Sequence, residues 1–439
     1  MTIKTKNLII GFGKAGKTLA ALFDKHGEET IVVEKSPKMY GGTCINIGCI
    51  PSKKLIYAGY RSGFSDAMKE KNILIDKLRQ ANYQKLDELS YVQVITASAS
   101  FIDDNTVKLS NGDTITAERI FINTGATPST LPIEGIDSKH VHDSTSLLYL
   151  SDKREHAPDH LVIIGGGFIA LEFAFMYRQF GSKVTIIENA PNILMNNDDD
   201  VRDVMLELLQ EQGIKLLLST DLQRFIEHEE YTEVITNNGT FNADAVLLAV
   251  GRRPNTKDLQ LENTSVTLTD RGYISCDDTL KASDHIWALG DVAGSPQFTY
   301  ISLDDYRIVA NHLFGDGTRS TADRSIFPTS VFVTPPLSHI GMSEKQAKES
   351  GKNYLVASLP ASSIVKAKIL KQEKGILKAV IDADTREILG VTLFCAQSHE
   401  IINLFKLAMD HGIKADYFKN QIFTHPTISE ALNQLFEQF

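Results

Sequence analysis

The chain repeats one strand–turn–helix pattern, and this repeat constrains the fold more than any other feature of the sequence. The first copy runs from the apolar strand Leu8–Ile10 through a glycine-rich turn into a helical segment, and the second starts from the strand Leu161–Ile164. In each copy a second apolar strand follows and ends in a glutamate. The first glycine and this glutamate are 23 residues apart in both copies, from Gly11 to Glu34 and from Gly165 to Glu188.

This pattern is typical of a unit that binds a dinucleotide. The first glycine makes a tight turn, the second lets the backbone approach a pyrophosphate, and the third position lets the helix pack on the strand. The glutamate can hold a ribose 2′-hydroxyl, and the helix N-terminus offers N–H groups and a positive dipole end to the phosphates. Two copies in register therefore predict two dinucleotide sites. The residues assigned to the first site are Gly11, Gly13, Gly16, Glu34 and Lys35, and those assigned to the second are Gly165, Gly167, Phe168, Ile169 and Glu188.

Length and charge limit the possible classes of protein. A chain of 439 residues is expected to form about two to four domains. The formal net charge of −10 argues against nucleic-acid binding, which needs basic patches. The first residues run directly into a strand, and no apolar run approaches the ~20 residues of a membrane span. We therefore expect a cytoplasmic protein with no signal peptide, no membrane and no nucleic-acid partner.

Two cysteines, Cys44 and Cys49, follow the first copy of the repeat and stand just ahead of a helical pattern. Residues five apart do not share a helical face, so a disulfide between them requires Cys44 to lie at a distorted first turn, because bridged Cα atoms approach within about 7 Å. A helix N-terminus lowers the pKa of a thiol and stabilises its thiolate. The pair is therefore a candidate redox disulfide beside a bound dinucleotide. Cys276 and Cys395 have no partner motif and are expected to be structural thiols.

The remaining segments predict further elements around these units. Charged positions interleaved with Leu, Ile and Met predict an amphipathic helix over residues 54–90. Two strands are expected to end in glycine turns, at Thr124-Gly125-Ala126 and at Gly290-Asp291. A third domain of the α+β class is expected to start near Ser325. Short strands are expected at 92–95, 119–122, 331–333, 376–381 and 388–394, and a helix at 399–411.

Together these motifs resemble the FAD-dependent pyridine nucleotide–disulfide oxidoreductases, a family that includes glutathione, lipoamide, trypanothione and mercuric reductases. The resemblance spans the whole chain and includes the C-terminal run Phe423–Glu430. It implies an α/β fold with two Rossmann-like domains, one for FAD and one for NAD(P), and a C-terminal α+β dimerisation domain. The implied boundaries are 1–145 for the first part of the FAD domain, 146–255 for the NAD(P) domain, 256–324 for the second part of the FAD domain, and 325–439 for the dimerisation domain.

Within this family, residues 11–18, 297–306 and 398–403 are similar to the hypothiocyanous acid reductases, a group that includes the reactive-chlorine-resistance flavoproteins. The resemblance implies an oxidoreductase that protects the cell from oxidants by reducing hypothiocyanous acid, a small molecule, to thiocyanate. A nicotinamide would reduce FAD, and the flavin would reduce the Cys44–Cys49 disulfide. Cys49 would be the charge-transfer thiolate against the flavin, and Cys44 would attack the electrophilic sulfur of the substrate.

The resemblance also implies roles for other residues. His425 would be the acid–base partner of Cys44, with Glu430 orienting its ring, and it would come from the other subunit of a homodimer. Lys53 and Glu172 would pair near the flavin and the nicotinamide. Gly251 would lie in the turn that returns the chain to the FAD domain. The other residues expected at the FAD are Gly42, Thr43, Lys53, Thr124, Gly125, Ala126, Gly290 and Asp291, and no metal site is expected.

The sequence leaves the nucleotide and the substrate open between alternatives. Glu188 favours NADH, because its carboxylate repels the 2′-phosphate of NADPH and no arginine follows it, although NADPH remains possible. Dihydrolipoamide dehydrogenase and a mercuric or copper ion reductase are the alternatives within the family. The turn Pro335-Pro336 speaks against the former, and a chain end without a cysteine pair speaks against a mercuric reductase. A redox sensor without turnover and a metal-handling protein are alternatives from other classes.

Overall fold

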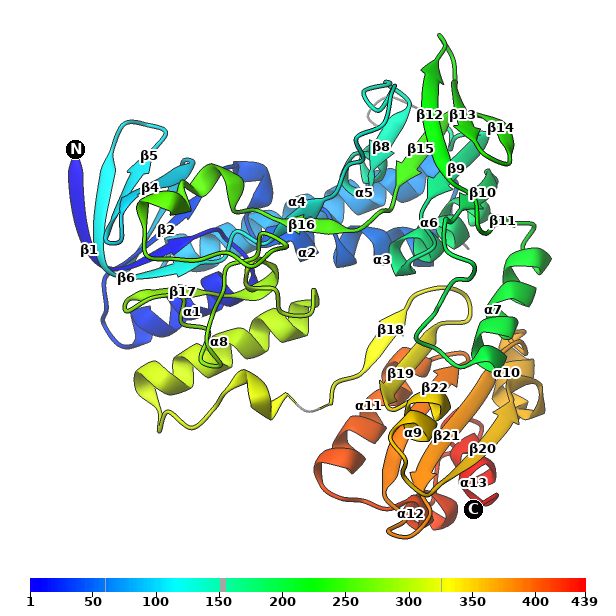
Figure 1. Ribbon diagram of the computed structural model, residues 1–439. Helices are drawn as coiled ribbons and strands as arrows, with labels where there is room; N and C mark the ends of the chain where they lie inside the picture. The colour runs from blue at the N-terminus through cyan, green and yellow to red at the C-terminus, as the bar shows by residue number, and fades with distance from the viewer. Residues whose placement is uncertain (60, 151–154, 325) are drawn as a thin grey trace.

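The computed structural model describes residues 1–59, 61–150, 155–324 and 326–439, and it divides into three parts that surround the middle of the molecule (Figure 1). The first part is built on a seven-stranded sheet with the order β3-β2-β1-β6-β5-β4, and β17 also pairs with β6. β1, β2, β3, β6 and β17 are parallel, whereas β4 and β5 are antiparallel. The strands are β1 (Thr2–Ile10), β2 (Thr30–Glu34), β3 (Val92–Thr96), β4 (Ala99–Asp103), β5 (Thr106–Leu109), β6 (Thr114–Ile122) and β17 (Ile286–Ala288).

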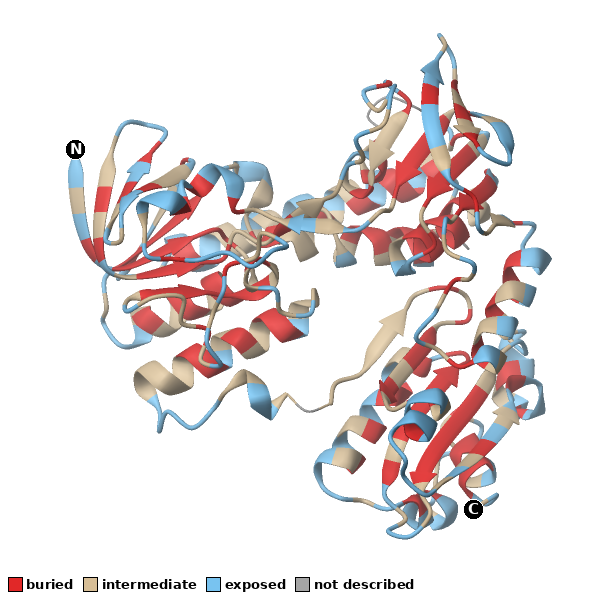
Figure 2. Ribbon diagram, in the orientation of Figure 1, coloured by how far each residue is buried: buried red, intermediate tan, exposed pale blue. Residues whose placement is uncertain are grey.

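Four helices belong to this part, and two of them, α1 and α8, pack on each other. Most residues of β2 and β6 are buried, and Figure 2 shows this burial at the centre of the sheet. The helices are α1 (Lys14–Lys25), α2 (Gly42–Asn46), α4 (Phe64–Asp87) and α8 (Thr299–Phe314), and α3 (Cys49–Ala58) extends from this part toward the second.

The second part is a five-stranded parallel sheet with the order β11-β10-β9-β15-β8, accompanied by a three-stranded antiparallel ribbon. A two-stranded ribbon, β7 with β16, runs between the first and second parts (Figure 1). The sheet consists of β8 (Val141–Asp143), β9 (His160–Ile164), β10 (Lys183–Ile187), β11 (Lys215–Leu217) and β15 (Ala245–Leu248). The ribbons are β12 (Leu222–Glu227), β13 (Thr232–Thr236), β14 (Gly239–Ala243), β7 (Ala126–Pro128) and β16 (Arg252–Pro254), and the helices are α5 (Ser144–Leu148), α6 (Phe168–Gln179) and α7 (Asp199–Glu211).

The C-terminal part is an antiparallel sheet with the order β18-β19-β22-β21-β20 and helices packed on it. Phe405, Phe418 and Phe436 stack in its core, with ring centroids 4.9 to 5.8 Å apart. The strands are β18 (Thr329–Val331), β19 (Leu337–Gly341), β20 (Tyr354–Pro360), β21 (Ile376–Asp382) and β22 (Ile388–Phe394). The helices are α9 (Glu344–Glu349), α10 (Val365–Leu370), α11 (Ser398–Asp410), α12 (Ala415–Asn420) and α13 (Ala431–Phe436).

The two copies of the sequence repeat fold into equivalent turns. Gly11 has φ +104° and donates its N–H to Val33, and Gly165 has φ +103° and donates to Ile187. A Cβ on Gly11 would lie 2.4 Å from the carbonyl oxygen of Asn123, so the backbone needs glycine there twice over, for its φ and for the close approach. The predicted α/β class with two dinucleotide-type units and a C-terminal α+β part is therefore confirmed.

Several local predictions need correction. The helix expected over 54–90 is two helices, α3 and α4, with glycines at 59 and 63 between them; Gly63 is the N-cap of α4. The strand expected at 331–333 is β18, which ends at Val331. The strands at 376–381 and 388–394 and the helix at 399–411 are confirmed as β21, β22 and α11. Ser325, the expected start of the third domain, lies outside the described residues. Among the described helices, none combines the length and apolarity that crossing a membrane requires.

A buried lysine connects the second part of the molecule to the C-terminal sheet. The Lys378 side chain on β21 is only 4% exposed and contacts three carboxylates, at 3.1 Å from Asp198, 2.9 Å from Asp200 and 2.6 Å from Glu344. Asp198 is the N-cap of α7, and its carboxylate also accepts the backbone N–H of Glu344. This lysine therefore neutralises a cluster of acids at the contact between α7, α9 and β21.

We predict that Lys378→Met destabilises the protein by about 3 kcal/mol, because breaking a buried ion pair leaves uncompensated charge behind. Lys374→Met is the matched control: Lys374 contacts Glu211 and Glu207 on the same helix α7, but its side chain is 47% exposed. Its loss should destabilise the protein far less, because ion pairs at an exposed surface contribute little to stability. Thermal unfolding of both variants measures the difference, and equal shifts in Tm would contradict the assigned role of Lys378.

Candidate active site

The two cysteines of interest lie at the junction of two short helices. Cys44 is in the middle of α2, and Cys49 is the first residue of α3. The sequence had allowed a disulfide with Cys44 at a distorted first turn; instead Cys44 belongs to a separate helix, and Ile47-Gly48 joins it to α3. Both cysteines are free thiols in this structure, Cys44 partly buried and Cys49 exposed. The structure therefore presents the dithiol form of the pair.

The two thiols have opposite acidities. A hydrogen bond from Cys44 lowers the pKa of Cys49 to about 6, and the nearby charge of Lys53 adds to this effect. The same hydrogen bond to Cys49, together with burial, raises the pKa of Cys44. Cys49 also stands at a helix N-terminus whose first turn holds no acidic residue, and such a position favours a thiolate. At neutral pH the pair therefore holds one proton, on Cys44, and Cys49 is the thiolate.

Residues from three distant segments contact Cys49 or Lys53, which follows it on α3. The Lys53 ammonium, one turn along α3, lies 2.6 Å from the buried carboxylate of Glu172 on α6. Glu172 also accepts the backbone N–H of Phe332 at 3.1 Å, and the Lys53 ammonium lies over the Phe332 ring. The predicted Lys53–Glu172 contact is thus present. The Thr299 hydroxyl at the start of α8, 3.7 Å from the Cys49 sulfur, was missed by the sequence analysis.

The first dinucleotide unit packs directly against the cysteine segment. A Cβ on Gly42 would lie 2.8 Å from Cα of Gly13, so the backbone at the start of α2 touches the turn before α1. Gly13 is the N-cap of α1, no side chain caps it, and no acid stands in the first turn. The Gly16 N–H in this turn donates to the Asn123 side chain, and the N–H groups that precede it can receive an anion. Glu34 ends β2 and accepts the N–H groups of Phe12 and Ser36, and burial raises its pKa.

A second set of residues in the first part fits a bound polyol. Burial raises the pKa of Asp291, and the charge of Arg252 opposes that effect. Within the described residues no hydrogen bond to the Asp291 carboxylate occurs, so this mostly buried acid has acceptor capacity for hydroxyl groups of a ligand such as a ribityl chain. Gly290 is held by its N–H to the fully buried Asp305, at 2.6 Å, and Asp305 also pairs with Arg324.

The remaining expected contacts lie along the same face. The Asn123 side chain bridges the first unit to this loop, accepting from Gly16 and donating to the Leu289 carbonyl. Gly125 has φ +71°, and the nearest atom to a Cβ there would be the Thr43 hydroxyl, 3.9 Å away. Gly251 has φ +103° and precedes β16, which pairs with Ala126 and its neighbours on β7. Gly11, Gly13, Gly16 and Gly290 therefore lie close to Asn123, and Gly125 lies close to Thr43; that these positions bind FAD stays a prediction. The Thr124 hydroxyl donates a hydrogen bond to the Asn255 carbonyl oxygen. Lys35 follows Glu34 at the end of β2.

The second unit has the same polar arrangement at its turn. Glu188 accepts the N–H groups of Gly166 and Ala190, as Glu34 does at the equivalent positions. Gly167 is an uncapped N-cap of α6, and the side chain of Phe168 just after it is 47% exposed. Glu172, the partner of Lys53, lies one turn further along this helix. α6 therefore connects the second unit to the cysteine pair.

His425 lies far from the cysteines of its own chain. His425 belongs to the segment that joins α12 and α13. Figure 1 shows these two helices at the bottom of the C-terminal part, whereas α2 and α3 lie in the upper half of the molecule. The Nδ1 of His425 is 2.7 Å from the Glu430 carboxylate, which lowers the pKa of Glu430, and its side chain is 70% exposed. In the described part of the chain no hydrogen bond involves its Nε2. The predicted His425–Glu430 pair is present, but one chain does not bring it to Cys44.

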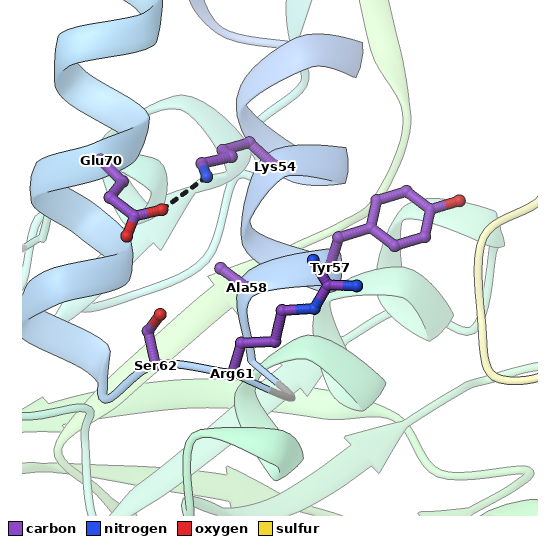
Figure 3. Close-up of a pocket in the computed structure, with 6 residues that line it drawn as sticks. All are labelled: Lys54, Tyr57, Ala58, Arg61, Ser62 and Glu70. Atoms are coloured by element: carbon purple, nitrogen blue, oxygen red, sulfur yellow. Dashed lines mark hydrogen bonds and ion pairs between the residues drawn. The ribbon is translucent and has the colours of Figure 1, made fainter.

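The other features of the surface do not add to this site. A cavity of about 310 Å³ beside the C-terminal end of α3 is lined by Lys54, Tyr57, Ala58, Arg61, Ser62 and Glu70, none of which was assigned to the site (Figure 3). Burial raises the pKa of Cys276 and of Cys395 to about 12, which makes both thiols unreactive. Among the described residues, no cluster of three or more His, Cys, Asp or Glu side chains could hold a metal ion.

Comparison with known proteins covers almost the entire chain. The family model "Pyridine nucleotide-disulphide oxidoreductase" matches residues 5–305, and the model of the dimerisation domain of the same family matches residues 327–436. The probable pyridine nucleotide-disulfide oxidoreductase RclA of Escherichia coli strain K12 is 45% identical over 99% of both chains. A dihydrolipoyl dehydrogenase of Geobacillus stearothermophilus is 32% identical over 98% of this chain and 94% of its own.

A solved structure agrees with the fold as closely. The Cu(II) complex of the HOCl-induced flavoprotein disulfide reductase RclA from Escherichia coli superposes with a TM-score of 0.96. The two sequences are 44% identical, and the alignment covers 99% of each chain.

We predict that Cys44→Ala raises the pKa of Cys49 from about 6 toward its ordinary value, because the main interaction that lowers it is a hydrogen bond from Cys44. Cys44→Ser is the control, since its hydroxyl still donates, and Cys49 should stay acidic in that variant. The pH dependence of iodoacetamide alkylation of Cys49, followed by mass spectrometry of its peptide, reports both values. Indistinguishable profiles for the two variants would show that Cys44 does not stabilise the thiolate.

Proposed function

The chain belongs to the pyridine nucleotide–disulphide oxidoreductases, and on this premise we propose that it reduces hypothiocyanous acid to thiocyanate through the Cys44–Cys49 pair. The family is one of flavoproteins that use FAD and a pyridine nucleotide, and the matched dimerisation domain indicates a homodimer. The proposed role is protection of the cell from oxidants. The likeness to RclA over the whole length supports this role, because a solved RclA is described as an HOCl-induced disulfide reductase.

The single observation that carries the proposal is the unequal acidity of the two thiols. An electrophilic sulfur substrate needs one cysteine that attacks it and a second that resolves the adduct. Cys49 is held as a thiolate by Cys44, Lys53 and Thr299, which suits the second role. Cys44 keeps the proton, and therefore has to lose it before it can attack.

Two cofactors are assigned to the two dinucleotide units. FAD, when bound, would accept two electrons from the nicotinamide and deliver them to the Cys44–Cys49 disulfide. The uncapped helix at Gly13, the acid Glu34 and the carboxylate of Asp291 would hold it, in a domain made of residues 1–145 and 256–324. NADH would bind the domain 146–255 at Glu188, whose carboxylate disfavours the extra phosphate of NADPH. Residues 325–439 would form the dimerisation domain.

The reaction at the cysteines proceeds in two displacements. The Cys44 thiolate attacks the sulfur of hypothiocyanous acid, the S–O bond breaks, and hydroxide leaves as water after taking a proton. The Cys49 thiolate then attacks the Cys44 sulfur, the bond to the thiocyanate sulfur breaks, and thiocyanate leaves with the electron pair. The two cysteines are oxidised to the disulfide, and the substrate gains two electrons. Over a cycle, NADH and hypothiocyanous acid give NAD⁺, thiocyanate and water.

His425 of the partner subunit is assigned as the base that removes the proton from Cys44. Its Nδ1–H donates to Glu430, which leaves Nε2 to accept the proton of Cys44 and then give it to the departing hydroxide. The Glu430 carboxylate is itself fixed by the N–H of Thr427 at 3.0 Å. Because this pair is exposed and remote from the cysteines of its own chain, a second subunit is the natural source of the base.

Reduction of a metal ion is a second candidate, because a solved relative was obtained as a Cu(II) complex. The thiolate of Cys49 and the adjacent thiol of Cys44 suit a soft metal ion as ligands, and oxidation of the pair to the disulfide would release the two electrons that reduce one Hg²⁺ to Hg⁰ or two Cu²⁺ to Cu⁺. Dihydrolipoamide oxidation is a third, given the 32% identity to a dihydrolipoyl dehydrogenase. Each of these substrates belongs in the same assay.

We expect the purified flavoprotein to oxidise NADH rapidly with hypothiocyanous acid and at least about tenfold more slowly with lipoamide, oxidised glutathione, Hg²⁺ or Cu²⁺. Cys44→Ser should abolish this turnover, because its hydroxyl cannot form the sulfur adduct. Cys276→Ser, which changes a buried thiol away from the pair, is the matched control and should retain activity. A preference for lipoamide would replace the proposed substrate and leave the dithiol mechanism in place.

A subunit-mixing experiment tests the origin of the base. His425→Gln should lower turnover by about 10²-fold or more, the usual effect of losing a general acid–base group. Mixing this inactive variant with inactive Cys44→Ser, under conditions that exchange subunits, should restore about a quarter of the wild-type activity, since half of the dimers would carry one intact site. If the histidine acted within its own chain, every mixed dimer would stay inactive.

A further inference from the structure

A lysine next to the segment that carries Cys44 is held by neutral groups. Lys17 lies on α1, one turn after Gly13, and its ammonium contacts the Asn82 side-chain oxygen at 2.6 Å and the Gly41 carbonyl oxygen at 3.5 Å. Gly41 immediately precedes α2, which carries Cys44. Within the described residues no carboxylate forms an ion pair with Lys17. An ammonium has three donors, so one of them remains for a ligand.

The position of this cation is costly unless an anion joins it. Burial and, to a smaller extent, the nearby charge of Lys14 lower the pKa of Lys17 to about 8, while Cys44 opposes the shift. A half-buried charge without a counter-ion is unfavourable. In the dithiol form Cys44 is protonated, so it does not supply that counter-ion. The chain as a whole is acidic, at −10, and this local positive charge beside the segment that carries Cys44 is opposite in sign to that net charge.

We propose that the Lys17 ammonium binds a small monovalent pseudohalide anion next to the Cys44 sulfur and holds the thiocyanate group as it leaves. This inference rests on the proposed reduction of hypothiocyanous acid. The leaving step places a full negative charge on thiocyanate at the Cys44 sulfur, and a preorganised cation aimed at that charge stabilises the transition state. Asn82 and Gly41 fix the ammonium in place, and α4 (Phe64–Asp87), which carries Asn82, packs against both α1 and α2. Lys17 is thus assigned as a specificity-determining residue.

The diphosphate of FAD is the competing anion. The N-terminus of α1 at Gly13 offers that group its backbone N–H donors. The Lys17 side chain instead points toward Gly41, which precedes α2, and toward Asn82 on α4. The two anions therefore predict different defects in a Lys17 variant. Loss of flavin from the purified variant would indicate the diphosphate, and weaker interaction with thiocyanate would indicate the pseudohalide.

Protection of Cys44 from alkylation measures the anion directly. Every protein compared also carries Cys49→Ala, which removes the thiolate to which Cys44 donates and leaves Cys44 as the reactive thiol of the pair. Each dimer is treated with iodoacetamide at constant ionic strength, with potassium thiocyanate replacing potassium sulfate, and the alkylated Cys44 peptide is quantified. We expect thiocyanate to slow alkylation in the wild type and Lys17→Gln to need about tenfold more thiocyanate for the same protection. Lys17→Arg should restore most of the protection. Lys25→Gln, an exposed lysine at the far end of the same helix, is the matched control and should behave as the wild type.

The outcomes separate this inference from the proposed function. Turnover of hypothiocyanous acid with equal protection in the wild type and Lys17→Gln overturns the anion site and leaves the function standing. Protection that depends on Lys17 without such turnover supports the site and overturns the function. Absence of protection in the wild type overturns the site on its own, even if Lys17→Gln fails to fold. Two results together would assign Lys17 to the FAD diphosphate and overturn the proposal. They are loss of FAD from Lys17→Gln and unchanged thiocyanate protection in Asn82→Ala.

Discussion

Close contact between two backbone turns holds this active site together. Gly13 ends the turn before α1 and Gly42 starts α2, and no side chain separates them, since a Cβ on Gly42 would reach Cα of Gly13. The same turn that offers N–H groups to a dinucleotide therefore carries the cysteine segment on its surface. Any residue larger than glycine would push Cys44 away from the cofactor face. Electron transfer between a flavin and a disulfide requires close contact between the two groups. The small size of the two glycines is therefore a condition for the chemistry.

Charge then decides which cysteine does what. Cys49 stands at a helix N-terminus with the Lys53 ammonium one turn away, whereas Cys44 lies within α2 and donates its proton. The Lys53 ammonium is itself held by the buried Glu172 on α6, which starts from the second dinucleotide unit. A single ion pair consequently connects the nucleotide-binding helix to the thiolate. The pair can make this connection because Glu172 lies on α6 and Lys53 lies on α3, rather than both on one helix.

The sequence predicted the parts of the site that have local signatures and missed those that depend on the tertiary fold. The repeat around Gly11 and Gly165 was readable because spacing and glycine chemistry are local properties. Thr299 contacts Cys49 across 250 residues of chain, and a threonine at the start of a helix has no distinguishing pattern. The break between α3 and α4 was missed because apolar and charged residues alternate with helical spacing on both sides of it. The short helix that carries Cys44 was not predicted, for a similar reason: five residues carry too little periodicity to be recognised.

The proton inventory of one chain explains why assembly and activity belong together. Reduction leaves the pair with one proton, on Cys44, and that proton has to move before the sulfur can attack. Lys17, the titratable neighbour of Cys44 on α1, is a cation and cannot accept it while charged. Cys49 can accept it only by giving up the thiolate that the second displacement needs. In the proposed reaction the base comes from outside this cluster. The exposed His425 offers Nε2, which takes part in no hydrogen bond within the described residues, and its ring is held by Glu430.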